Sequence, residues 1–366
     1  PNFVYDLSRV ERTRTTLSNR PVRTNRNSSG PATRGFTPSS MDLMPIPTFT
    51  EKITQKMETP VIYFYSKEEV DVNVKVDFPR GVISQWFPNV SSINPSDEAQ
   101  NGYGVWDIKV LKEITANLPR TSGNSIWNPS RETKANIVKV ENELEKLIFY
   151  RGLGDFDTAL KILADDDKII VINNSKEEIK GLILLNHREG VQEFTHVKLL
   201  EAFSKVTIKS SQNKFETFSS YMKSAKKKIV EDLIQSGLYE DESVAMVNTW
   251  EGGYFQTKGL RLLYVLPREW TDEILPIKMK PEPKELVRTL VGRIEILTNK
   301  DDEKILNYVN TKIKNNNLTF FEIDGKEMKG LGHFPEPKLR RALDLDITVD
   351  LKEKIRNHLK TMNQGF

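Results

Sequence analysis

Apolar and polar residues alternate most clearly in the first half of the chain. From Val70 to Phe78, every second residue is Val or Phe, which is typical of a strand with one buried face. Short β-branched and aromatic runs at Val61–Tyr65, Val82–Phe87 and Gly104–Leu111 predict further strands. Closely spaced strands with Pro- and Gly-containing turns predict a β-sandwich-like domain over residues 57–150.

The second half of the chain combines predicted strands with helices. Strand-like runs cover 158–163, 168–173, 179–186 and 191–199, and apolar runs at Leu260–Leu266 and Leu286–Leu297 suggest strands deep in a core. Leu147–Tyr150 is expected to be a strand that ends in a tight loop at Arg151–Gly154. The apolar stripe within Ser211–Gln235 predicts a helix. We therefore expect a β-rich α+β fold, with a mixed β-meander and helix domain over 151–366.

The N-terminal segment has a different composition. Residues 1–56 are expected to form an extended arm rich in Arg, Pro, Ser and Asn, since such a segment buries too little apolar surface to offset its ordering entropy. We expect the arm to be ordered by contact with its own body or with a neighbouring chain. Its arginines are the candidate partner-binding residues: Arg9, Arg12, Arg14, Arg20, Arg23, Arg26 and Arg34.

Composition narrows the class of protein. The 366 residues carry a net charge of only +3, which is too balanced for the whole protein to be a nucleic-acid binder. The chain has no Cys, which excludes disulfides, thiolate metal sites and cysteine nucleophiles and favours an oxidising exterior. No apolar run approaches the length of a membrane-spanning helix. We expect an extracellular, periplasmic or cell-envelope location, with the cytoplasm as the alternative.

One group of residues in the sequence is a candidate catalytic site. Glu251 stands beside Gly252-Gly253, and aromatic residues and Asp272 follow nearby in the sequence. In an aromatic-walled cleft, Glu251 and Asp272 could act as the acid and base of a hydrolase, for example on glycans. The alternative, which we favour, is that the aromatic residues pack in the core or at its rim and that the glycines form a turn.

Metal and nucleotide motifs are weak. His187 and His196 lie several positions apart in the expected hairpin, and the acidic triplet Asp165–Asp167 lacks the spacing of an EF-hand. Gly152-x-Gly154 and Gly330-x-Gly332 do not extend to a phosphate-binding motif. We expect no metal site and no cofactor.

Several segments together resemble an uncharacterised, exported bacterial protein family. They are METPVIYFYS (57–66), VDVNVKVDFPRGVISQWFP (70–88), FYRGLG (149–154), GGYFQTKGLRLLYVLPREWTDEILPI (252–277), ELVRTLVGRIEILT (285–298) and GHFPEPKLRRAL (332–343). The resemblance implies a bacterial envelope or extracellular setting, and it carries no reaction, ligand or catalytic residue.

These observations favour a non-enzymatic structural or interaction subunit of a larger assembly that engages other protein chains through its N-terminal arm. The main alternative is the secreted hydrolase with Glu251 and Asp272. A weaker alternative is binding of a polyanion or nucleic acid by the basic arm.

Overall fold

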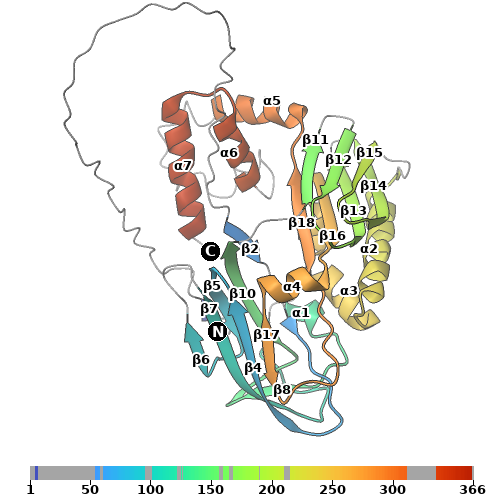
Figure 1. Cartoon of the computed structure of the whole chain (residues 1–366), viewed down its shortest axis with the longest axis vertical. Helices are drawn as coiled ribbons and strands as arrows, with labels where there is room; N and C mark the ends of the chain where they lie inside the picture. The colour runs from blue at the N-terminus through green and yellow to red at the C-terminus, as the bar shows by residue number, and fades with distance from the viewer. Residues whose placement is uncertain are drawn as a thin grey trace, which may run out of the picture.

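The computed structural model of the protein is built mainly from antiparallel β-sheets, with helices packed on them (Figure 1). This confirms the β-rich α+β class. The structure describes residues 5–6, 54–57, 61–94, 101–121, 125, 127–155, 160–164, 168–188, 190–209, 215–310 and 335–364.

A six-stranded sheet forms around the alternating segment. Its order is β17 (Ile277–Lys280), β4 (Val70–Phe78), β7 (Gly102–Val110), β8 (Val138–Val140) and β9 (Glu143–Glu145), and β6 (Ser92–Asn94) also pairs with β7. The strand predicted over Val70–Phe78 is confirmed, with Val74 and Val76 fully buried. The strand predicted at Gly104–Leu111 is also present, shifted by one or two residues.

A five-stranded sheet contributes side chains to the same core. Its order is β1 (Tyr5–Asp6), β5 (Gly81–Phe87), β10 (Ile148–Asp155) and β2 (Thr54–Met57), and β3 (Val61–Ile62) also pairs with β10. Ile148 and Tyr150 from this sheet pack with Val74 and Trp106 from the six-stranded sheet. The run Val61–Tyr65 is a strand only at its first two residues.

The expected loop at Arg151–Gly154 is wrong. Strand β10 continues through these residues, with a register shift between Arg151 and Gly152. A Cβ atom at Gly152 would overlap the ring of Phe78 and the carbonyl oxygen of Val82. The glycine is therefore needed for close packing against the neighbouring strand β5 and against β4 of the other sheet, and it does not mark a turn.

Two further sheets form the second half. One has the order β14 (Val191–Leu200), β13 (Ile179–Arg188), β16 (Gly259–Val265) and β18 (Val291–Ile296), and the other has the order β11 (Leu160–Ala164), β12 (Lys168–Asn173) and β15 (Lys205–Lys209). These strands agree with the runs predicted from 158 to 199 and at Leu260–Leu266. The run Leu286–Leu297 becomes a strand only from Val291 to Ile296. Apolar side chains from both sheets form one core between them.

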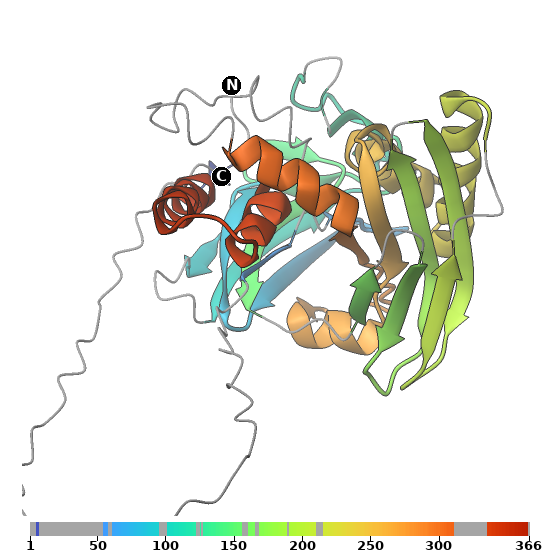
Figure 2. The same cartoon turned by 90° about the horizontal axis from the view of Figure 1, so that it is seen from above.

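Helices cover the other face of the four-stranded sheet. The predicted helix is present as α2 (Phe218–Gln235), which begins after Thr217 accepts a hydrogen bond from the amide of Ser220. Ile229 and Leu233 of α2 pack against Ile183 and Leu263 of the sheet, and Figure 2 shows the helix along the outer side of these strands. Short helices α1 (Trp127–Ser130) and α3 (Glu240–Thr249) lie next to each other.

The C-terminal helices form a separate small core. Helices α5 (Asn299–Tyr308), α6 (Pro335–Asp344) and α7 (Val349–Gln364) share buried residues that include Val309, Leu339 and Ile355. The sequence also predicts a short strand at Thr319–Ile323, and these residues lie outside the described part of the chain. Within the described part of the chain, none of the helices has the length and apolar character to span a membrane.

The two halves of the chain are joined by more than the covalent connection at residue 150. Strand β17 comes from the second half and pairs with β4, so that Met279 faces Val74. In addition, Tyr65 donates a hydrogen bond to Glu242 at 2.9 Å, and the amide of Lys134 donates to Asp241 at 2.7 Å. The division at 150/151 stays a prediction, but the β17 pairing crosses it.

Candidate functional site beneath a π-helical turn

The stretch around Glu251 folds into a π-helical turn, η1 (Gly252–Gln256), between α3 and β16. Such turns are rare and occur often at functional sites. Arg261 of β16 holds this turn in place through hydrogen bonds. Its Nη1 donates to the carbonyl oxygens of Gly253 (3.0 Å) and Tyr254 (2.8 Å) and to the Thr257 hydroxyl (2.6 Å). A guanidinium thus satisfies carbonyl groups at the end of the turn.

Arg261 is only 1% exposed, and a second strand supplies its counter-charge. Its Nε lies 3.3 Å from Oε1 of Glu295 on β18, and Nε of Arg293 lies 3.4 Å from the same oxygen. Burial lowers the pKa of Arg261, and the charge of Glu295 opposes this effect. Gly259 makes the approach possible, because a Cβ there would lie 3.1 Å from Nη2 of Arg261 at a φ of +147°.

A histidine and a tyrosine complete the polar cluster. His187 of β13 stacks on Phe218 of α2 at a ring-centroid distance of 4.8 Å and lies 6.1 Å from the ring of Tyr221. Nδ1 of His187 and the Tyr221 hydroxyl are both buried without a hydrogen-bond partner. Burial lowers the pKa of His187 and raises that of Tyr221, so both side chains are neutral at neutral pH.

The sequence contained a usable signal for part of this cluster. Strand β16 reads GLRLLYV, and Arg261 occupies an inward-facing position between apolar residues. A charged residue at such a position requires a buried partner. The partner itself could not be read from the sequence, because Glu295 is brought opposite Arg261 by pairing of β16 with β18.

Glu251 lies at the start of the π-helical turn on the side of the sheet covered by α2. Its Oε2 lies 2.5 Å from Nζ of Lys226, and its Oε1 accepts a hydrogen bond from Gln256 at 2.9 Å. The flanking Trp250 and Tyr254 stack on each other at 6.1 Å and pack into the core beneath α2. Glu251 is therefore ion-paired at the edge of a packed core.

Asp272 lies in α4 (Arg268–Ile274), a helix that was not predicted from the sequence. Its two carboxylate oxygens lie 2.6 Å from Nε of Arg268 and 2.6 Å from Nη1 of Arg288. Partial burial opposes ionisation, but the hydrogen bonds and charges of the two arginines outweigh it and lower the pKa of Asp272. This carboxylate ties α4 to the segment that precedes β18.

Glu251 and Asp272 are not brought together. Residues around Glu251 pack with Leu263, whereas Trp270 and Ile274 of α4 pack with Leu262. Neighbouring residues in a strand point to opposite faces of the sheet, so the two carboxylates belong to opposite sides of it. The arrangement provides no shared cleft for acid and base chemistry.

The remaining sequence candidates are placed as follows. His196 pairs with Ile183, four positions along β13 from His187, and its Nε2 lies 2.8 Å from Asp232. Among the residues that the structure describes, no group of three or more His, Asp or Glu side chains could hold a metal ion. The seven arginines of the arm lie outside the described residues, as does the Asp165–Asp167 triplet.

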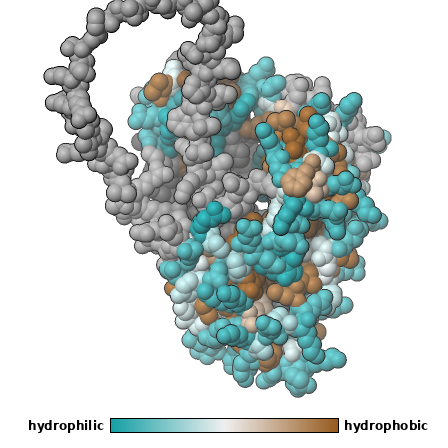
Figure 3. Space-filling model, in the orientation of Figure 1, coloured by the Kyte–Doolittle hydropathy of each residue, from teal (hydrophilic) through white to brown (hydrophobic). Residues whose placement is uncertain are grey.

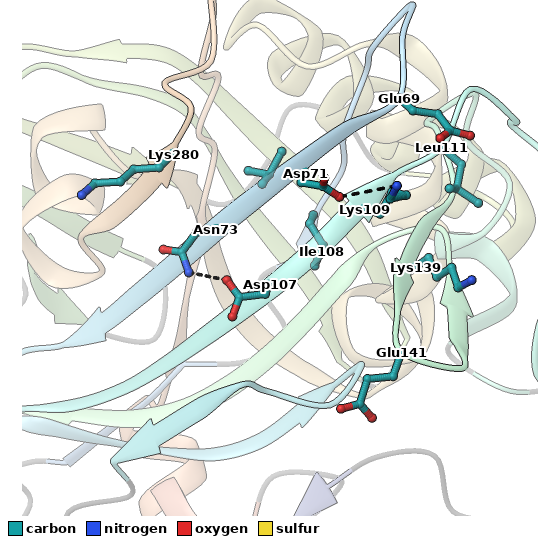
Figure 4. Close-up of a pocket in the computed structure, with 11 residues that line it drawn as sticks. Glu69, Asp71, Asn73, Asp107, Ile108, Lys109, Leu111, Lys139, Glu141 and Lys280 are labelled. Atoms are coloured by element: carbon teal, nitrogen blue, oxygen red, sulfur yellow. Dashed lines mark hydrogen bonds and ion pairs between the residues drawn. The ribbon is translucent and has the colours of Figure 1, made fainter.

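A polar groove of about 770 Å³ crosses the outer face of the six-stranded sheet (Figure 4). Asn73 donates to Asp107 at 2.7 Å across β4 and β7, and Lys109 lies 3.8 Å from Asp71 on the next rung. The groove contains carboxylates and lysines in similar numbers, with no aromatic lining residue. Its mixed charge does not select one class of ligand.

Comparison of the chain with protein-family models, with curated proteins and with solved structures gave no match. The functional interpretation therefore rests on the geometry of the structure. In the cluster beneath the π-helical turn, each charged group has a counter-charge or a set of carbonyl partners, which suits a structural clamp. Neutral His187 and Tyr221 add polar groups that a small enclosed molecule could use.

Proposed function

We propose that the protein is a non-enzymatic structural or interaction subunit of a larger envelope or extracellular assembly, and that its N-terminal arm engages neighbouring chains. The observation that carries this proposal is strand β1. Tyr5 and Asp6 pair with Trp86 and Gln85 at the edge of β5, so the arm adds a strand to the body. The proposal also includes a β-sandwich-like domain over residues 57–150, built from the strands of the five- and six-stranded sheets that fall in this range.

Strand addition uses main-chain hydrogen bonds and is therefore available equally to the arm of the same chain and to that of a neighbour. Exchange of such a segment between identical subunits is a low-cost route to oligomers. The five-stranded sheet takes strands from the N-terminal region at both ends, since β2 pairs with β10 on the side opposite β5.

Charge gives the arm a second means of attachment. Residues 1–35 contain seven Arg and two acidic residues, which is a net charge of +5. Since the whole chain carries +3, residues 36–366 carry a net charge of −2. Opposite net charges of arm and body favour their association, more strongly at low ionic strength.

The placement of Glu251 and Asp272 supports a role without catalysis. Each is held by ion pairs on its own side of the sheet, and each ties neighbouring elements together. A pair of groups with fixed counter-charges stabilises the fold in its present form.

Deletion of residues 1–48 tests the proposal. This deletion removes β1 and all seven arginines and keeps β2, so we expect the body to stay folded and the assembly to be lost. Light scattering coupled to size-exclusion chromatography gives the mass of the particle, and far-UV circular dichroism reports the fold. A truncated protein that assembles like the full chain overturns the proposal.

A second variant distinguishes the contribution of strand addition from that of the positive charge of the arm. Replacement of the seven arm arginines by Gln keeps the main chain of β1 and removes the positive charge. If strand addition dominates, this full-length variant assembles at low salt; if charge dominates, it behaves like the truncated protein.

A further inference from the structure

The outer face of the three-stranded sheet is basic and partly apolar. In β11, β12 and β15, alternate residues point into the core shared with the four-stranded sheet, and the others face outward. The outward residues are Lys161 and Leu163, then Lys168, Ile170 and Ile172, then Lys205, Thr207 and Lys209. Four of these eight are Lys, and none is Asp or Glu.

The lysines are placed close to one another across the strands. Lys168 is directly opposite Lys209, and Lys161 and Lys205 lie on either side of Ile172 on one rung. Like charges directly opposite each other destabilise a sheet. None of the four forms an ion pair within the part of the chain that the structure describes. Repulsion between these lysines opposes the folding of this sheet, and an anionic surface against this face would offset the repulsion.

An apolar stripe runs between the lysines. Leu163 is 47% exposed, and Ile170 and Ile172 are half-buried. Figure 3 shows apolar atoms over the region of β11 and its neighbours, bordered by hydrophilic atoms. The patch is therefore amphipathic, with cations around aliphatic side chains.

Phe203 extends this surface at one end. It lies in the turn between β14 and β15, next to the end of β12, where the amide of Asn173 donates to Ser204. Its side chain is 74% exposed, and its φ of +50° is unusual for a bulky residue. Phe203 is at the end of the sheet opposite the connection between β11 and β12.

We propose that this face docks the protein on the surface of a bilayer that contains anionic lipid. Lysines attract anionic headgroups, while Phe203, Leu163 and the two isoleucines contact the boundary between headgroups and acyl chains. Apart from Phe203, the apolar side chains of the patch are aliphatic and cannot stack on bases, so a lipid surface fits the patch better than a nucleic acid. Attachment through a sheet face requires no membrane-spanning helix.

Vesicle flotation of the full-length protein tests this inference. We expect binding to vesicles of phosphatidylcholine mixed with phosphatidylglycerol, and no binding to phosphatidylcholine alone. Binding should fall when salt is raised from about 0.1 M to about 1 M, because the screening length shortens from about 10 Å to about 3 Å. Inorganic phosphate at millimolar concentration should not compete, because it lacks an apolar surface.

The variant Lys161→Gln/Lys205→Gln removes two charges next to Phe203, and we expect its partition coefficient to fall about 30-fold. The matched control is Lys109→Gln/Lys139→Gln, which changes the same charge on neighbouring strands of the six-stranded sheet. This control should bind like the unchanged protein. Equal losses in the two variants mean that net charge alone causes the binding, which overturns the proposal.

Phe203→Asn tests the apolar part without a risk to folding, because Asn tolerates positive φ better than Phe. We expect weaker binding that retains its dependence on salt. Unchanged vesicle binding by Phe203→Asn, or binding of heparin or DNA with no binding of anionic vesicles, also overturns the proposal.

Discussion

Replacement of Tyr221 by Phe should make the protein more stable. The Tyr221 side chain is fully buried, and its hydroxyl has no hydrogen-bond partner. A buried polar group without a partner costs about 1–3 kcal/mol. Removal of this hydroxyl leaves the ring packing intact, so we expect the free energy of unfolding to rise by about 1 kcal/mol.

Tyr63→Phe is the matched control, because it also removes one tyrosine hydroxyl but is expected to lower the free energy of unfolding. The Tyr63 hydroxyl donates to the carbonyl oxygen of Ser130 at 2.8 Å. Its loss should lower the free energy of unfolding by about 1–2 kcal/mol, since the bond disappears and the acceptor loses its partner.

Urea denaturation followed by tryptophan fluorescence is the suitable assay. The entropy of unfolding grows with chain length, so 1 kcal/mol shifts the melting temperature of a chain of this size by only about 1–2 °C. Equal destabilisation by Tyr221→Phe and Tyr63→Phe would refute this prediction. The Tyr221 hydroxyl would then be hydrogen-bonded in solution, and the cluster beneath the π-helical turn would enclose a bound polar molecule.

Two further substitutions test the packing and the charges. Gly152→Ala should lower the free energy of unfolding by about 3 kcal/mol, because the added Cβ overlaps Phe78 and Val82. Urea denaturation measures this change, and an unchanged free energy of unfolding would contradict the close contact described at Gly152. Asp272→Asn should destabilise the protein more at pH 7 than at pH 2, because the ion pairs of Asp272 weaken as its carboxylate becomes protonated. The pKa of Asp272 is lowered on folding, so its contribution is present above the usual pKa and is lost as the pH falls through the folded value. Glu269→Gln in the same helix is the control, and an equal loss at both pH values would contradict the ion-pair argument.

The fold was predictable where one face of a strand or helix is buried along its whole length. Val70–Phe78 was identified correctly because burial of every second residue leaves a period of two in the sequence. The helix that became α2 was identified by its apolar stripe in the same way. At Gly152, the sequence pattern was misleading, because glycine permits both a turn and a close approach inside a sheet.

The site was less predictable, because its residues meet through pairing of distant segments. Glu251 and Asp272 are close in sequence, yet β16 lies between them and directs their neighbours to opposite faces. His187, Arg261 and Glu295 are far apart in sequence and meet on one face of three adjacent strands. The local pattern of apolar and polar residues predicts which face of a strand is buried, but it does not predict which strand lies beside it.

Pairing of β17 with β4 also constrains the synthesis of the chain. After the ribosome has made residue 150, another 130 residues must follow before Lys280 can reach Asn73. At about 5–20 residues per second, this takes about 7–26 s. Throughout this time, one edge of β4 has no strand beside it. An exposed strand edge can pair with other chains, so the newly made first half is open to such pairing until β17 arrives.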